Sequence, residues 1–236
     1  MSTVKVKGIV IAENNMGDFD KMLTVLTPNG KISCSAKGAR RPKSQLMAGT
    51  QFLCFADFMM FKGGSTYTVN SCETIELFYN IRIDIDKLNY AVHITKIIQD
   101  VTDENQNTYK ILQLYLNTLY VISETDMDLE FVVSIFKMRL MCLLGFRPIL
   151  EKCCSCGEEN VHHFSFKDNG LKCDACSKQD TGAIEISDST KNALKYIAVA
   201  PAKKLYSFNI SNENKKQLEI ISKIYTNDKL EKEYKM

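Results

Sequence analysis

The sequence contains no long hydrophobic run. None of its apolar segments approaches the roughly 20 residues that an α-helix needs to cross a bilayer. The first seven residues also lack the apolar stretch of a secretory signal peptide. We therefore expect a cytoplasmic protein, associated with the nucleoid if it binds DNA, that has no membrane partner.

The motifs of common catalytic sites are also missing. There is no HExxH motif, no GxSxG motif, no glycine-rich phosphate loop ending in Lys-Ser or Lys-Thr, and no carboxylate cluster. Catalytic groups can come from distant positions, so this absence argues against an enzyme without excluding one. We expect a binding protein that is not an enzyme, and nucleotide hydrolysis by the purified protein would contradict this.

Acidic residues are absent between Asp20 and Asp57, although basic residues are frequent there. Besides Lys21 and Lys31, this stretch holds a basic cluster made of Lys37, Arg40, Arg41 and Lys43. The net charge is only +2, but a polyanion responds to local charge. A merely soluble loop is the alternative, and the missing acids favour polyanion binding.

Nine cysteines are present, and four of them have the spacing of a metal site. The pattern is C-x₂-C-x₁₆-C-x₂-C, formed by Cys153, Cys156, Cys173 and Cys176. Two residues between thiols allow a tight turn that brings both sulfurs to one metal, and Gly157 permits unusual backbone angles after the first turn. Four thiolates leave no open position, so we expect one structural Zn²⁺ ion.

Other ligand sets stay possible. Cys154 could replace Cys153, His162 or His163 could take part, and an iron–sulfur site is a second choice. The remaining thiols should stay reduced in the cytoplasm and pack as small hydrophobic groups; they are Cys34, Cys54, Cys72, Cys142 and Cys154.

The first 76 or so residues have the pattern of β-strands. Turn signals at 28–30 and 63–64 separate apolar, β-branched segments at 4–11, 22–27, 31–36, 52–61 and 66–75. Gly8 indicates a bulge or bend. Five strands with short turns and one long basic loop suit a small closed barrel. Four aromatic residues could form a base-stacking platform, but we expect them to fill the barrel: Phe52, Phe55, Phe58 and Phe61.

Helical patterns follow from about residue 80. Apolar stripes predict helices from Asp84 or Asp86 to 101, over 109–121 and over 128–144, with later helices over 189–200 and 213–226. We expect a bundle, with a charged tail that frays from residue 227. A partner groove could involve four further side chains, although a bundle core is the commoner explanation: Tyr115, Tyr120, Met138 and Met141.

Several segments in order resemble a known family. They are Gly8-Ile9-Val10-Ile11, Gly17 to Thr27, Gly30-Lys31-Ile32, Lys37 to Arg41, Leu143 to Pro148, and the paired cysteines. Their order is similar to the bacterial recombination mediator family RecO, over nearly the whole chain. The resemblance implies an α+β multidomain protein with a five-stranded N-terminal OB-fold barrel at 1–79 and a helical domain at 80–236. A Cys₄ zinc finger would be inserted at 150–180.

The resemblance also implies a function in the RecF pathway of DNA repair. Members of this family bind single- and double-stranded DNA and anneal complementary strands. With RecR they help to load RecA onto DNA coated by single-strand binding protein. Charge placement makes Lys37, Arg40, Arg41 and Lys43 the main candidates for phosphate contacts, with Lys5, Lys7 and Lys31 as weaker ones. The alternative is a protein-interaction adaptor with a structural zinc finger and no direct DNA binding.

Overall fold

The computed structural model describes residues 2–64 and 66–235. The chain forms two compact units, of which the first ends at Gln113 and the second begins at Leu114. The expected domain ranges 1–79 and 80–236 stay a prediction. Within the described residues, no helix is both long enough and apolar enough to span a bilayer.

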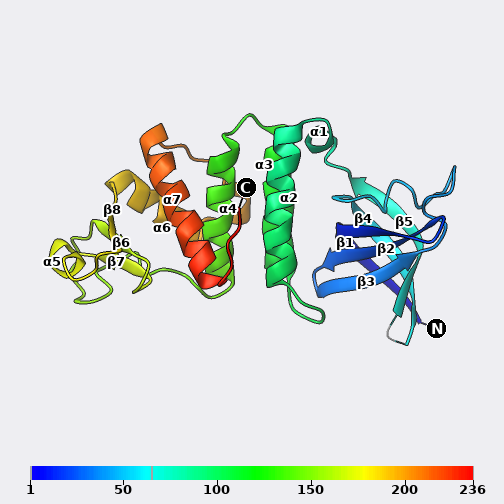
Figure 1. Ribbon diagram of the computed structural model, residues 1–236, viewed down its shortest axis with the longest axis horizontal. Helices are drawn as coiled ribbons and strands as arrows, with labels where there is room; N and C mark the ends of the chain where they lie inside the picture. The colour runs from blue at the N-terminus through cyan, green and yellow to red at the C-terminus, as the bar shows by residue number, and fades with distance from the viewer. Residues whose placement is uncertain (1, 65, 236) are drawn as a thin grey trace. The chain divides into compact units, whose positions relative to one another are not determined.

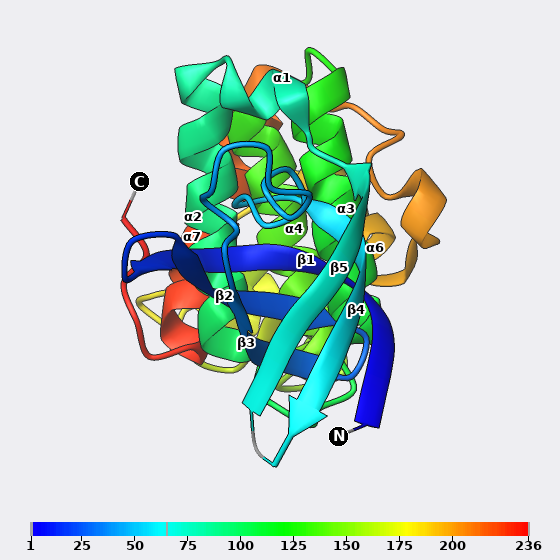
Figure 2. The same cartoon turned by 90° about the vertical axis from the view of Figure 1, so that its right-hand side faces the viewer.

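Five strands of the first unit close into a barrel in the order β1-β2-β3-β5-β4 (Figures 1 and 2). They are β1 (Ser2–Met16), β2 (Asp20–Thr27), β3 (Gly30–Ala36), β4 (Phe55–Gly63) and β5 (Thr66–Glu76). Strand β1 closes the barrel because it pairs with two neighbours: Ile9 lies opposite Leu26 of β2 and opposite Phe55 of β4. This arrangement confirms the expected OB-type barrel.

The barrel core shows the alternation expected of strands with one buried face. Its buried side chains include Val10, Leu23, Val25, Phe58 and Met60. The core interpretation is therefore correct for Phe58. It is wrong for Phe61, which is 40% exposed because its strand position points outward.

Gly8 does not mark a bulge. The register shift of β1 lies between Val10 and Ala12 instead. At Gly8 a Cβ atom would lie 2.5 Å from Cγ1 of Val25, so close packing against β2 requires a glycine there.

Two helices follow the barrel within the first unit, α1 (Tyr79–Arg82) and α2 (Ile85–Val101). Asp84 caps α2, since its side chain accepts hydrogen bonds from the backbone N–H groups of Asp86 and Lys87.

The link after α2 is fastened to the turn between β2 and β3. The Thr108 hydroxyl accepts a hydrogen bond from the Gly30 N–H at 2.9 Å and donates one to the Thr27 carbonyl at 2.5 Å. The Lys31 N–H donates to the Asp103 carbonyl at 3.0 Å. Gly30 has φ +105°, and a Cβ there would lie 2.5 Å from the Asp103 oxygen. Only glycine fits this position.

The helix α3 (Tyr109–Glu124) begins before the unit boundary, and α4 (Leu129–Leu143), α6 (Asp188–Val199) and α7 (Asn212–Lys229) pack together in the second unit (Figure 1). A short 3₁₀ helix, Ala202–Lys204, follows α6. Arg139 of α4 donates three hydrogen bonds to the last carbonyl groups of α6, on Ile197, Ala198 and Ala200. This satisfies acceptors that a helix end leaves without partners.

The helical expectations agree with these elements, apart from the tail. Tyr115, Met138 and Met141 are buried in the core, whereas Tyr120 is 59% exposed. The expected fraying from residue 227 is wrong, because α7 continues to Lys229 and the Tyr234 side chain beyond it is buried.

Between α4 and α6 lies a small sheet that the sequence analysis did not foresee. Its order is β7-β6-β8, with β6 (His163–Ser165), β7 (Gly170–Lys172), β8 (Ile184–Glu185) and the helical turn α5 (Asp174–Ser177). These strands are too short to show a periodic pattern.

A buried ion pair holds this small sheet to the segment after α5. The Lys172 ammonium lies 2.9 Å from Asp180, and both side chains are almost fully buried. It also lies 2.5 Å from Asp168. The Ser165 hydroxyl donates to Asp180, and this bond together with that of Lys172 lowers the pKa of Asp180 to about 2. Removing one partner of such a pair leaves an uncompensated buried charge.

We therefore predict that Asp180→Ala lowers the free energy of unfolding by about 1.5–3 kcal/mol, measured by urea denaturation, because it removes a charged acceptor of Lys172 and Ser165 while Asp168 still pairs with the Lys172 ammonium. Combining it with Lys172→Met should recover part of the loss, because no ammonium group is then buried there. The control is Glu233→Ala, which removes an exposed ion pair with Lys235 and should change stability by less than about 0.5 kcal/mol. An Asp180→Ala protein as stable as this control would contradict the prediction.

Candidate nucleic-acid interface and metal centre

The basic cluster lies in the loop that joins β3 to β4. All four of its side chains are exposed: Lys37, Arg40, Arg41 and Lys43. The structure thus brings together the four main candidates for phosphate contacts on one loop.

This loop is anchored to the turn between β1 and β2. The Arg40 N–H donates to the Phe19 carbonyl at 2.9 Å, and the Gly38 N–H donates to Oδ1 of Asp20 at 2.7 Å. The Arg41 guanidinium lies 5.5 Å from the centroid of the Phe19 ring, a cation–π contact. The backbone is therefore fixed while the charged groups face solvent.

Sequence reasoning assigned no role to Phe19 or Asp20. Phe19 is 44% exposed, which is uncommon for a large apolar side chain in a turn of polar residues. An aromatic residue in this polar turn is the one sequence signal that could have indicated the contact of Phe19 with the basic loop.

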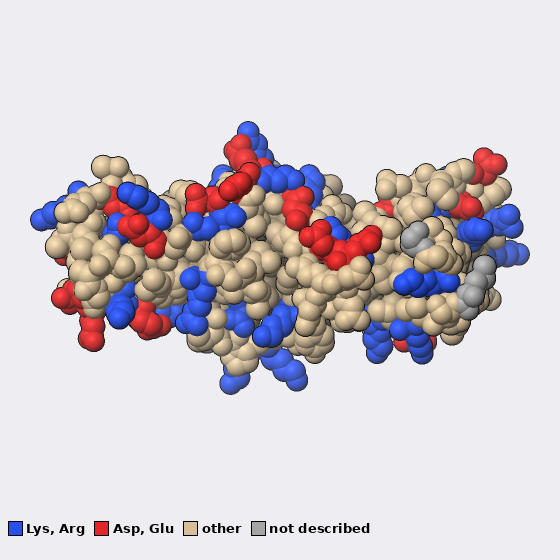
Figure 3. Space-filling model, turned by 90° about the horizontal axis from the view of Figure 1, so that it is seen from below, with Lys and Arg blue, Asp and Glu red and all other residues tan. Residues whose placement is uncertain are grey.

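The three weaker candidates lie elsewhere on the barrel. Lys5 and Lys7 are exposed on β1, where the Lys5 ammonium is 3.6 Å from Asp57. Lys31 stands at the start of β3, at the end opposite the basic loop, and donates to the Gln99 carbonyl at 2.8 Å. That bond gives Lys31 a structural role in holding α2. Figure 3 shows lysine and arginine side chains around the barrel, at the right of the view.

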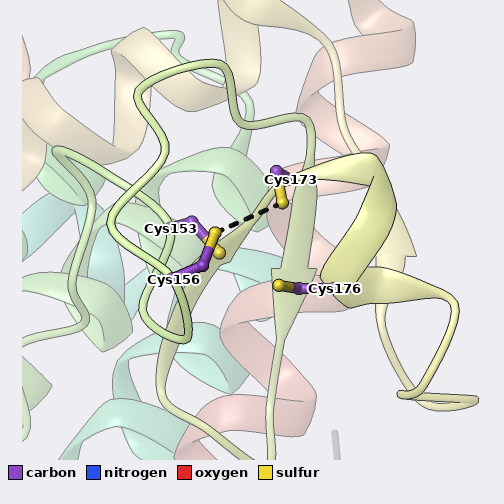
Figure 4. A group of neighbouring side chains, drawn as sticks. All are labelled: Cys153, Cys156, Cys173 and Cys176. Carbon is purple, nitrogen blue, oxygen red and sulfur yellow. Dashed lines mark hydrogen bonds between the residues drawn. The ribbon is translucent and has the colours of Figure 1, made fainter.

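The second candidate site is the cysteine cluster. The sulfur atoms of Cys153, Cys156, Cys173 and Cys176 all lie within 4.8 Å of one another, so these four residues could hold a metal ion (Figure 4). The Cys156 and Cys173 sulfurs are 3.7 Å apart. Four sulfurs placed tetrahedrally about 2.3 Å from zinc would be about 3.8 Å from one another. The cluster therefore fits zinc in both donor type and size.

Local backbone geometry shapes the cluster. Gly157 has φ +82°, the left-handed conformation that ends the first turn, and its N–H donates to the Cys153 carbonyl at 2.9 Å. Cys173 follows β7, and Cys176 lies in α5, so the second pair is presented by the small sheet.

The thiols differ in acidity. Burial opposes ionisation of Cys153, but hydrogen bonds from the backbone N–H groups of Cys173, Cys156 and Ser155 outweigh it and lower its pKa to about 6. Hydrogen bonding with Cys156 and Cys173 raises the pKa of Cys176 to about 12. Four adjacent thiols thus cannot all ionise at neutral pH unless a cation compensates their charge.

The alternative ligands lie outside the cluster. Cys154 is not in it, and its N–H instead donates to the Leu171 carbonyl at 2.8 Å. Nε2 of His162 donates to Oδ1 of Asn160 at 2.7 Å, and Nδ1 of His163 lies 3.4 Å from Asp174. Burial raises the pKa of Cys34 to about 12 and of Cys54 to about 11, as expected for thiols that pack in a core.

Comparison with known proteins identifies relatives over the whole chain. Residues 1–78 match the family model "Recombination protein O N terminal", and residues 82–236 match "Recombination protein O C terminal". A protein of Acetivibrio thermocellus named "DNA repair protein RecO" is 44% identical over 237 residues, 99% of this chain and 94% of that protein. Proteins of the same name are 36% identical in Alkaliphilus metalliredigens (88% of this chain, 86% of that protein) and 30% identical in a Thermoanaerobacter species (100% and 96%).

The loop anchor leads to a testable expectation. Asp20→Ala removes the charged acceptor of the Gly38 N–H, a hydrogen bond worth about 1.5–3 kcal/mol. The loop should then open about tenfold more often or more, and trypsin should cleave after Arg40 at least that much faster. The control is Asp18→Ala, an exposed position in the same turn, which should leave the cleavage rate unchanged. Equal rates for both variants would show that Asp20 does not hold the loop.

Proposed function

Because the chain belongs to the RecO family, we propose that it is a recombination mediator in DNA repair. It binds single- and double-stranded DNA and anneals complementary strands. With RecR it helps to load RecA onto DNA coated by single-strand binding protein. Its role is to bind and assemble, without catalysing a chemical step.

The observation that carries this proposal is the anchored basic loop on an OB-type barrel. Barrels of this type bind single strands through a positive groove combined with stacking surfaces. Because the loop backbone is already fixed, the loop loses less conformational entropy on binding DNA than a mobile loop would. Contacts of lysine and arginine with phosphates carry no base information, so binding tolerates any sequence.

The cysteine cluster serves the fold in this proposal. It holds one Zn²⁺ ion through Cys153, Cys156, Cys173 and Cys176, and the ion supplies a structural crosslink. Four thiolate ligands leave no position for water or substrate, which supports a non-catalytic role. The spacing of the four sulfur atoms, all within 4.8 Å of one another, supports this assignment.

We predict that Lys37→Glu/Arg40→Glu/Arg41→Glu abolishes tight binding to single-stranded DNA, measured by fluorescence anisotropy at several salt concentrations. The four phosphate contacts of the basic loop contribute about −2.8 to the log–log salt slope of the natural protein, or about a 50-fold loss of affinity between 50 and 200 mM salt. With one loop contact left, the slope should become about 2.1 less steep.

The matched control reverses three exposed lysines of the second unit, at 178, 203 and 204, with the same change in net charge. It should keep the natural slope. Should both triple variants bind alike, the DNA contacts lie outside the basic loop. If the natural protein does not bind DNA at all, the adaptor function without DNA binding replaces this proposal.

Metal removal should affect the cysteine cluster and leave the basic loop unchanged. A structural zinc ion in a small domain contributes about 10–16 kcal/mol, so chelation should unfold residues 150–180, seen as lost hydrogen-exchange protection there. Binding to single-stranded DNA should persist, because the basic loop lies on the barrel. Cys173→Ser should lose the ion, whereas the neighbouring Cys154→Ser should keep one zinc per chain by elemental analysis. Full zinc content in Cys173→Ser would refute the ligand assignment.

A further inference from the structure

A cleft of about 420 Å³ opens on the barrel at the end of β3 opposite the basic loop. Its walls are the first part of β1, the start of β3, the hairpin between β4 and β5, and the link after α2. Lys31, which lines the cleft, and Lys37 are six residues apart, or about 20 Å along an extended strand. The cleft and the basic loop are therefore two separate places on one barrel.

The cleft combines one aromatic ring with three ammonium groups. Its lining includes Lys5, Lys31, Lys62 and Tyr67, with Glu104 as its acidic member. The charge of the lining is therefore net positive. An aromatic ring among cations is the combination with which single-stranded nucleic acids are held without sequence preference.

Tyr67 is placed to offer one face of its ring. It lies on β5 opposite Lys62 of β4 and packs against the barrel core, which leaves it half-buried. The Lys62 ammonium lies 5.2 Å from the centroid of the ring. The Lys62 ammonium covers one face of the Tyr67 ring, so a base that stacks on this face must displace it.

The three lysines are held to different degrees. The Lys31 ammonium donates to the Gln99 carbonyl at 2.8 Å, and the Lys5 ammonium lies 3.6 Å from Asp57 with a mostly exposed side chain. Lys62 contacts the Tyr67 ring. Lys62 is therefore the one of the three lysines that is placed against the ring.

We propose that this cleft is a nucleotide subsite selective for single-stranded DNA, an inference that rests on the proposed function. The Tyr67 ring stacks on one unpaired base, and the displaced Lys62 ammonium binds the neighbouring phosphate. A base inside a duplex is already stacked and paired, so it cannot enter the cleft unless it is first unstacked and unpaired. Duplex DNA therefore binds through the basic loop alone, and single strands bind through both places.

A tryptophan reporter tests the stacking directly. The chain contains no tryptophan, so Tyr67→Trp introduces a single indole whose emission is separable from that of tyrosine. Single-stranded DNA should quench it, and a duplex of the same sequence should not. The matched control is Tyr79→Trp on α1, where the natural side chain is 65% exposed and lies outside the cleft; neither DNA should quench it.

Affinity measurements supply the second readout. Tyr67→Leu keeps an apolar group against the core but removes the aromatic face, so affinity for single strands should fall about 5- to 150-fold. Affinity for duplex DNA should change by less than about twofold, and Tyr67→Phe should bind both as the natural protein does. Lys62→Gln should make the single-strand salt slope about 0.7 less steep.

The outcomes separate the subsite from the function. The inference stands if Tyr67→Leu lowers the affinity for single strands but not for duplex DNA, and if the emission of Tyr67→Trp is quenched by single strands but not by duplex DNA. It is overturned if the natural protein binds single strands, the emission of Tyr67→Trp does not change on adding them, and Tyr67→Leu binds them with natural affinity. Equal loss of both DNA forms in Tyr67→Leu, with a natural circular dichroism spectrum, also overturns the selectivity. A natural protein that binds neither DNA form overturns the proposed function and the subsite together.

Discussion

Strand β1 is the constraint on which the first unit depends, because it pairs with β2 along one edge and with β4 along the other. Residues 2–9 of β1 pair with β4 and residues 9–16 pair with β2, so the strand closes the barrel and sets the position of the segments attached to the strand ends. Phe19, which supports the basic loop, follows β1, whereas Lys5 and Lys62, which line the cleft, lie on β1 and β4. Both candidate DNA contacts thus depend on a single closed hydrogen-bond network and keep their geometry only while β1 stays paired on both sides.

The small sheet of the second unit is stabilised by a different principle. Strands of two or three residues bury too little apolar surface to be stable alone. The four cysteines bring the segment before the sheet close to the one that follows β7, and the buried Lys172–Asp180 pair ties β7 to the segment after α5. One aromatic contact joins it to the helices, where the rings of Phe164 and Tyr225 meet edge to face at 5.7 Å. Local crosslinks here do what a hydrophobic core does in the barrel.

Much of this architecture could be predicted from the sequence, since its signals are periodic or have fixed spacing. Alternating strands, apolar helix stripes and the cysteine pairs are of that kind. Other features depend on contacts between distant residues. Phe61 lies three positions after Phe58 on the same strand, so the alternation of side chains turns it outward, which its aromatic character alone did not indicate. The partnership of Asp20 with Gly38 and the burial of Tyr234 follow from how segments meet in space. The acidity of Cys153 depends on backbone N–H groups that no residue type reveals.

The turn between β2 and β3 shows that a turn at the surface need not tolerate sequence variation. Pro28-Asn29-Gly30 has the composition of an ordinary exposed turn, the sort of segment in which homologous proteins usually drift. Here it is enclosed by the link after α2, with the Thr108 hydroxyl bridging Gly30 and Thr27. Selection should therefore treat this turn as it treats interior positions. Across descendants of this gene, substitutions at Gly30 should be as rare as in the barrel core, and insertions should collect at the β4–β5 hairpin instead.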